Sequence, residues 1–178
     1  MAIFDCFQYF NEEHIADLRF NILNDFVDKF IIVESTIDHQ GKPKKLNFDI
    51  NKYKKFKKKI KYIIVDDTPK NLIKPHTGGE SLVEKHQRNS IMKGLTDADE
   101  NDLIILSDVD EIPDLKKLNQ YDKSKYGVFS QRMFMYKINF LNIKENNWHG
   151  SKICLKKNLK SPQWLRDLKF KEYPFWRI

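Results

Sequence analysis

Short runs of consecutive apolar residues alternate along this chain with stretches in which apolar residues recur every three or four positions. The runs at 30–33 and 103–106 are each four apolar residues long, which is typical of strands buried on both faces of a parallel sheet. Further strands are expected at 2–7, 62–65, 126–136, 138–143 and 152–155.

The segments between the first strands have the apolar spacing of helices. A helix is predicted over 14–26, after an N-cap at Asn11, with one buried stripe made of Ile15, Leu18, Ile22, Leu23 and Phe26. A second helix is predicted over 80–95 and a short one over 115–118. Strands that alternate with helices indicate an α/β fold with a mostly parallel central sheet flanked by helices.

Polar residues follow several of the predicted strands. Asn11 and Glu12 come after the first strand, Glu34 and Ser35 after the second, and Asp108 after the run at 103–106. Because ligands of such sheets bind beyond the carboxyl ends of the strands, we expect these residues along one rim. Each also has a structural interpretation: Asn11 as a helix cap, Glu12 as a charge in a first helical turn, and Glu34 as an exposed strand end.

The segment Asp108-Val109-Asp110-Glu111 concentrates three carboxylates in four residues. If it is extended, Asp108 and Asp110 project to one side while Val109 packs on the other. Crowded carboxylates repel one another unless a cation offsets the charge, and oxygen ligands suit magnesium or manganese. We therefore predict a metal-diphosphate site at Asp108 and Asp110, the alternative being a plain acidic turn that leads into the short helix.

Composition narrows the class of protein. A chain of 178 residues fits a single domain over 1–178, and with 40% hydrophobic and 13% aromatic residues it is expected to fold rather than stay disordered. Cys6 and Cys154 are too far apart in sequence to form a disulfide framework or a thiolate motif. No apolar run predicts a membrane span and the first residues lack a secretory pattern, so a cytoplasmic location is expected. The apolar ending at 175–178 indicates a chain that lacks its C-terminal part.

The basic charge is confined to one segment. Residues 42–61 contain ten Lys and one Asp, a net charge of +9 in a chain whose total is +7, so the remainder carries −2. Within this segment Tyr53, Phe56 and Ile60 have helical spacing, which predicts an amphipathic helix with a lysine face over 52–61. That face is either solvated or binds an anionic partner such as RNA or a membrane surface; no specific nucleic acid is expected.

An ordered set of motifs resembles glycosyltransferase family 17, whose best-known member type adds the bisecting N-acetylglucosamine to the β-mannose of N-glycans. The resemblance runs from residue 3 to about residue 114. Its motifs are Ile3-Phe4-Asp5-Cys6-Phe7, Phe10-Asn11-Glu12, Leu18-Arg19-Phe20-Asn21-Ile22-Leu23, Val27-Asp28-Lys29-Phe30, Val33-Glu34-Ser35, Gly41-Lys42-Pro43, Gln87-Arg88-Asn89 and Ser107-Asp108-Val109-Asp110-Glu111-Ile112-Pro113.

This resemblance implies a GT-A-like nucleotide-binding fold and a β-1,4-N-acetylglucosaminyltransferase-like activity. It implies that Asp108 and Asp110 hold Mn²⁺ or Mg²⁺ against the diphosphate of a UDP-sugar donor, from which the sugar passes to a glycan acceptor with inversion. It also implies a nucleoside pocket lined by four residues, which are Asn11, Glu12, Glu34 and Arg88.

The resemblance leaves the catalytic base open. Glu111 is adjacent to the metal pair and is either this base or a brace for the loop. Family members carry a Gly-Trp-His segment nearer the C-terminus, whereas here Trp148-His149 follows Asn147 and comes earlier. We therefore expect the acceptor half of the site to be incomplete in this chain.

Two alternative functions remain. A non-catalytic module would use the lysine-rich segment to bind an anionic polymer or a nucleotide. A phosphohydrolase would use the first aspartate of the Asp-x-Asp pair as its nucleophile, but that fold starts with the motif, and here about 107 residues precede it. An EF-hand is excluded because Pro113 and Asn119 stand where the calcium loop needs Gly and Glu.

Overall fold

The structure, a computed structural model, describes residues 1–73, 81–123, 125–135, 140–144 and 147–169. Six strands form one sheet in the order β3-β2-β1-β4-β6-β5. The strands β1 (Ile3–Gln8), β2 (Lys29–Ser35), β3 (Ile60–Val65) and β4 (Leu103–Leu106) pair in parallel. β6 (Lys152–Leu155) and β5 (Gly127–Val128) complete the sheet in antiparallel pairings. The prediction of an α/β fold with a mostly parallel sheet is confirmed.

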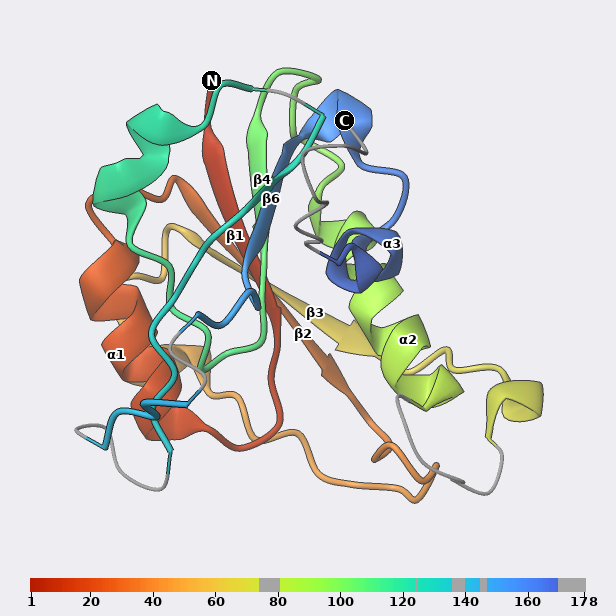
Figure 1. Cartoon of the computed structure of the whole chain (residues 1–178). Helices are drawn as coiled ribbons and strands as arrows, with labels where there is room; N and C mark the ends of the chain where they lie inside the picture. The colour runs from red at the N-terminus through yellow and green to blue at the C-terminus, as the bar shows by residue number, and fades with distance from the viewer. Residues whose placement is uncertain (74–80, 124, 136–139, 145–146, 170–178) are drawn as a thin grey trace.

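Helices cover both faces of this sheet (Figure 1). One face packs against α1 (Glu13–Leu23), in a buried cluster that includes Phe7, Phe20, Phe30, Leu103 and Ile105. The other face packs against α2 (Leu82–Asn89), the 3₁₀ helix η3 (Ser90–Gly94) and α3 (Pro162–Asp167), in a cluster that includes Cys6, Ile31, Ile91, Ile104 and Leu165. Because β4 has apolar contacts on both faces, all four of its residues are buried.

The buried face of α1 differs from the predicted stripe. The inward residues are Ala16, Arg19, Phe20 and Leu23, whereas Leu18 and Ile22 are exposed. Leu23 is buried and Ile15 and Phe26 pack against the same cluster, so the stripe was wrong only for Leu18 and Ile22, and it missed Arg19, whose burial no apolar pattern reveals. The predicted cap was also wrong, since the helix begins after Glu12, without a side-chain cap, rather than after Asn11.

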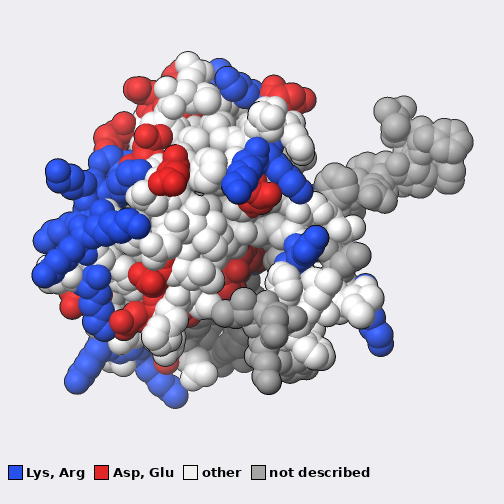
Figure 2. All heavy atoms as spheres, turned by 90° about the vertical axis from the view of Figure 1, so that its left-hand side faces the viewer, with Lys and Arg blue, Asp and Glu red and all other residues white. Residues whose placement is uncertain are grey.

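The lysine-rich segment does not form the predicted amphipathic helix. It contains the 3₁₀ helix η1 (Ile50–Tyr53), a series of turns over 54–59 and then the start of β3. Tyr53 and Phe56 are buried as their spacing suggested, which leaves Lys54, Lys55 and Lys57 among the exposed residues. Figure 2 shows lysines gathered along one side of the molecular face that carries α1.

Several of the remaining predicted elements differ in extent or type from what the sequence indicated, whereas β6 has the predicted bounds. The second helix splits into α2 and η3, and the short helix is the 3₁₀ helix η4 (Leu115–Gln120). The strand expected at 126–136 is only β5 together with isolated bridges, and position 136 lies outside the described residues. The strand expected at 138–143 is absent from its described part, 140–143. Within the part of the chain that the structure describes, no helix is long and apolar enough to cross a membrane.

Candidate active site

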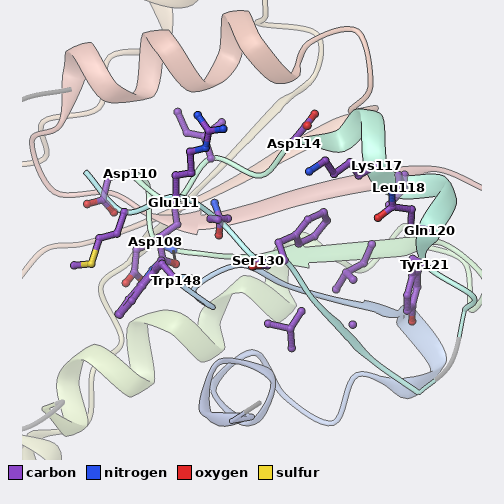
Figure 3. Close-up of a pocket in the computed structure, with 18 of the residues that line it drawn as sticks. Asp108, Asp110, Glu111, Asp114, Lys117, Leu118, Gln120, Tyr121, Ser130 and Trp148 are labelled. Atoms are coloured by element: carbon purple, nitrogen blue, oxygen red, sulfur yellow. Dashed lines mark hydrogen bonds between the residues drawn. The ribbon is translucent and has the colours of Figure 1, made fainter. Parts of the chain in front are cut away.

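A cavity of about 1460 Å³ opens at the carboxyl end of β4. Asp108, Asp110 and Trp148 lie at one end of it, and Gln120 and Tyr121 lie at the other (Figure 3). Its walls come from α1, the segment after β4, η4 and the segment that contains β5. The two predicted metal ligands, Asp108 and Asp110, therefore face the same cavity.

The Asp-x-Asp segment is a turn and not the extended strand end that we predicted. The backbone N–H of Glu111 donates to the carbonyl oxygen of Asp108 at 3.1 Å, which closes the turn. Val109 is 7% exposed and packs inward as expected. Asp110 is exposed, and the side chain of Asp108 is 40% exposed. Both carboxylates reach the cavity because of the turn, rather than through the alternation of a strand.

A buried arginine on α1 holds the backbone of this turn. The Nη1 of Arg19 donates to the carbonyl oxygens of Asp108, Val109 and Glu111 at 3.0, 3.1 and 3.2 Å. Its Nε and Nη2 donate to the two carboxylate oxygens of Asp5, on β1, at 2.7 and 2.6 Å. Both side chains are 0% exposed, so each charge depends on the other for its compensation. This positioning of the turn was missed by the sequence analysis.

Two further arginines approach Asp108 from the opposite face of the sheet. The Nη2 of Arg166, on α3, lies 2.6 Å from Oδ2 of Asp108, and the Nη2 of Arg88, on α2, lies 3.6 Å from Oδ1. Arg88 also pairs with Glu84 at 2.8 Å and donates to Gln163 at 2.7 Å. The carboxylates of Asp108 and Glu111 are thus offset by protein cations. Arg88 was a predicted site residue, whereas Arg166 was not recognised.

Glu111 is 8% exposed, and its carboxylate ties the turn to two other segments. Its Oε1 accepts from the indole nitrogen of Trp148 at 2.7 Å, and its Oε2 accepts from the backbone N–H of Asp108 at 2.9 Å and from Arg166 at 3.2 Å. A Cβ at Gly150 would collide with this carboxylate and with the Trp148 indole, so a larger residue there would displace the hydrogen bond between them. The contacts of Glu111 are those of a brace.

A buried lysine lies near the same cluster. Lys152, on β6, is 3% exposed, and its Nζ donates to the carbonyl oxygen of His149. Burial lowers the pKa of this ammonium group, and the Arg166 charge lowers it further, while Glu111 and Asp108 act in the opposite direction. Three cations, Arg88, Arg166 and Lys152, therefore lie close to the carboxylates of Asp108 and Glu111.

The other predicted residues lie on the same rim but outside the lining of the cavity. Glu34 is 0% exposed, and its carboxylate accepts from the Lys44 ammonium at 2.6 Å, from the Tyr62 hydroxyl at 2.7 Å and from two backbone N–H groups. It is therefore not the exposed strand end that we considered, and it fixes the segment at 44–48. The Glu12 carboxylate accepts from the backbone N–H of Asn11, in the turn after β1. Contact of these residues with a nucleoside stays a prediction.

A comparison with protein families covers most of the chain. The model of glycosyltransferase family 17 matches residues 1–163. The chain belongs to glycosyltransferase family 17. The match continues past residue 114, where the sequence motifs end, through β5 and β6 to the first residues of α3. A search of curated proteins gave no match. Membership implies a glycosyltransferase activity with a sugar donor and an acceptor.

The carboxylates of this glycosyltransferase suit a divalent cation. Asp108 and Asp110 supply hard oxygen ligands at one end of the cavity. Among the residues that the structure describes, no three or more His, Cys, Asp or Glu side chains group into a complete metal site. Magnesium-type ions are commonly held by one or two carboxylates together with substrate phosphates and water, so the donor set fits a metal that arrives with a diphosphate.

Proposed function

We propose that this glycosyltransferase uses a UDP-sugar donor, with a preference for UDP-N-acetylglucosamine, and transfers the sugar to a glycan acceptor in a β-1,4 linkage. The proposal includes a GT-A type of fold and a Mn²⁺ or Mg²⁺ ion held by Asp108 and Asp110. The observation that carries it is the turn after β4, whose two carboxylates face a large cavity while Arg19 fixes its backbone.

The residues of the turn have separate roles in this proposal. Asp108 and Asp110 would hold the metal, which supplies positive charge to the departing diphosphate. Arg19 keeps the turn in one conformation, so that little reorganisation is needed during the reaction. Glu111 remains a candidate for the base, but its contacts with Trp148 and Arg166 support a positioning role.

The transfer itself requires one bond to form as another breaks. The acceptor hydroxyl attacks the anomeric carbon on the side opposite the diphosphate, the bond from that carbon to the phosphate oxygen breaks, and a base accepts the hydroxyl proton. Such a base contributes about 10²- to 10⁴-fold to the rate. We assign the nucleoside end to the rim that carries Asn11, Glu12 and Arg88, with Glu34 holding the adjacent segment.

The glycan would bind at the far end of the cavity. Its lining there includes a polar and an aromatic side chain, Gln120 and Tyr121, the types that saccharide-sized sites require.

A donor assay tests this proposal. The chain is incubated with UDP-N-acetylglucosamine, UDP-glucose or UDP-galactose, with an N-glycan acceptor, and with manganese or EDTA, and UDP release and product are measured. We expect manganese-dependent UDP release from UDP-N-acetylglucosamine, and a loss of about 10²-fold or more of this release in Asp110→Asn.

Asp114→Asn is the matched control for this assay. Asp114 lines the same cavity and caps η4 by accepting from the backbone N–H of Lys116, a role that Asn also fills. It should therefore retain the rate. Transfer that is equal in EDTA, or equal losses in the two variants, would contradict the metal site.

A further inference from the structure

Arg166 bridges the two carboxylates that begin and end the turn after β4. Its Nη2 lies 2.6 Å from Oδ2 of Asp108, and its Nη1 lies 3.2 Å from Oε2 of Glu111 and donates to the carbonyl oxygen of Gly150 at 3.0 Å. Its side chain is 18% exposed, so these contacts are only partly screened by water. Arg166 also lies beyond residue 163, where the family match ends.

A metal and Arg166 would compete for the same carboxylate. A cation that takes Oδ2 of Asp108 meets the positive guanidinium at 2.6 Å from that oxygen, and Arg88 stands at 3.6 Å from Oδ1. Two neighbouring guanidinium groups therefore oppose a metal that arrives without an anion.

A diphosphate removes this opposition. Guanidinium groups match phosphate oxygens in charge and geometry, and a charged fork can bond two such oxygens at once. Arg166 is anchored on α3 by the buried Leu165 beside it, so its side chain can exchange one partner while the helix stays in place.

We propose that Arg166 is a phosphate-binding residue of the donor site, which holds Asp108 in the free protein and exchanges it for a diphosphate oxygen when a metal takes that carboxylate. This inference rests on the proposed function. The metal and the nucleotide then bind cooperatively, because the metal releases Arg166 from Asp108 and the diphosphate takes up the guanidinium that opposes the metal. Such coupling is reciprocal.

The test measures two affinities whose changes should have opposite signs. Manganese binding without nucleotide is measured by electron paramagnetic resonance, and UDP binding at saturating manganese by isothermal titration, in the wild type, Arg166→Gln and Arg166→Lys. In Arg166→Gln we expect manganese alone to bind more tightly, about threefold or more, because a competing positive charge is gone. UDP should bind about tenfold more weakly or worse, because a charge-assisted hydrogen bond is lost.

Arg166→Lys retains the charge but not the fork, so manganese alone should bind as in the wild type, while UDP affinity falls between the two. Lys169→Gln is the matched control, because Lys169 is an exposed cation three residues after Arg166 that does not line the cavity, and its loss changes net charge equally. Neither affinity should change there by more than about twofold.

The outcomes separate the inference from the proposed function. Weaker binding of both ligands in Arg166→Gln would show that Arg166 only supports the turn, and unchanged UDP affinity would show that it does not reach the phosphates; either result overturns the inference while the function stands. A wild type without manganese-dependent UDP binding overturns the proposed function, and the inference with it.

Discussion

Replacement of Arg19 by Met should destabilise the chain far more than the loss of an exposed ion pair. The guanidinium of Arg19 bonds both carboxylate oxygens of Asp5, the hydroxyl of Ser107 at 2.6 Å and three carbonyl groups of the turn, and the side chains of Arg19 and Asp5 are 0% exposed. Removing one partner of a buried pair leaves the other charge uncompensated, which costs about 3–5 kcal/mol. This is a large part of the roughly 5–15 kcal/mol by which domains are stable.

The matched control is Lys52→Met. Lys52 pairs with Glu13 at the same distance, 2.6 Å, but the two side chains are 51% and 47% exposed. Exposed pairs contribute at most about 1 kcal/mol, so this variant should stay close to the wild type. Urea unfolding followed by circular dichroism gives both free energies of unfolding.

A double variant separates charge from geometry. Arg19→Met combined with Asp5→Leu leaves no unpaired buried charge on that face, so it should recover part of the stability lost in Arg19→Met alone. Its turn still lacks the donor to three carbonyl groups, so manganese-dependent UDP binding should remain weak. Equal destabilisation by Arg19→Met and Lys52→Met would refute the reasoning.

Three further predictions concern other parts of the chain. Replacing the exposed Lys54, Lys57 and Lys58 by Gln should leave UDP binding unchanged at physiological salt. These lysines precede the amino end of β3, whereas Asp108 follows the carboxyl end of β4, at the opposite edge of the sheet. A loss of affinity that persists at high salt would contradict this placement. Glu34→Gln should lower the free energy of unfolding by about 1–3 kcal/mol, because Lys44 loses its buried counter-charge, and an unchanged urea midpoint would contradict it. Burial raises the pKa of Tyr121 from 10.0 to about 12, so its contribution to stability is complete below pH 10 and is lost as the pH rises towards 12. The urea midpoint should therefore fall less between pH 8 and pH 11 in Tyr121→Phe than in the wild type, and an equal fall in the two proteins would count against the shift.

The apolar runs of the sequence were enough to predict the four parallel strands and β6, but not the extent of β5. The residues of β4 and of the centre of β2 are uninterrupted apolar runs because both of their faces are buried. The family motifs located the carboxylates after β4. The lysine-rich segment shows the limit of periodicity, since Tyr53 and Phe56 are buried as spaced although turns and not a helix bring them inward. Periodicity reports which residues face the core, and several backbone shapes satisfy it.

The polar framework of the site was beyond the sequence patterns. Arg19 occupies an inward position of α1 that an apolar pattern skips, and the signal that would have found it is the opposite charge of Asp5 at an inward position of β1. Arg166 lies 58 residues from Asp108, so only the three-dimensional fold brings the two together. Glu34 was selected for its place at a strand end, but the contacts that occupy its carboxylate depend on the segment at 44–48.

Isothermal titration of the chain with UDP, in manganese and in EDTA, tests the central claim most directly. The account predicts weak binding in EDTA and tighter binding with manganese. It predicts that Asp110→Asn, an exposed substitution that leaves the fold intact, abolishes the difference between the two conditions. A UDP affinity that is the same with and without manganese, or one that Asp110→Asn leaves unchanged, would contradict the assignment of Asp108 and Asp110 to a metal-diphosphate site.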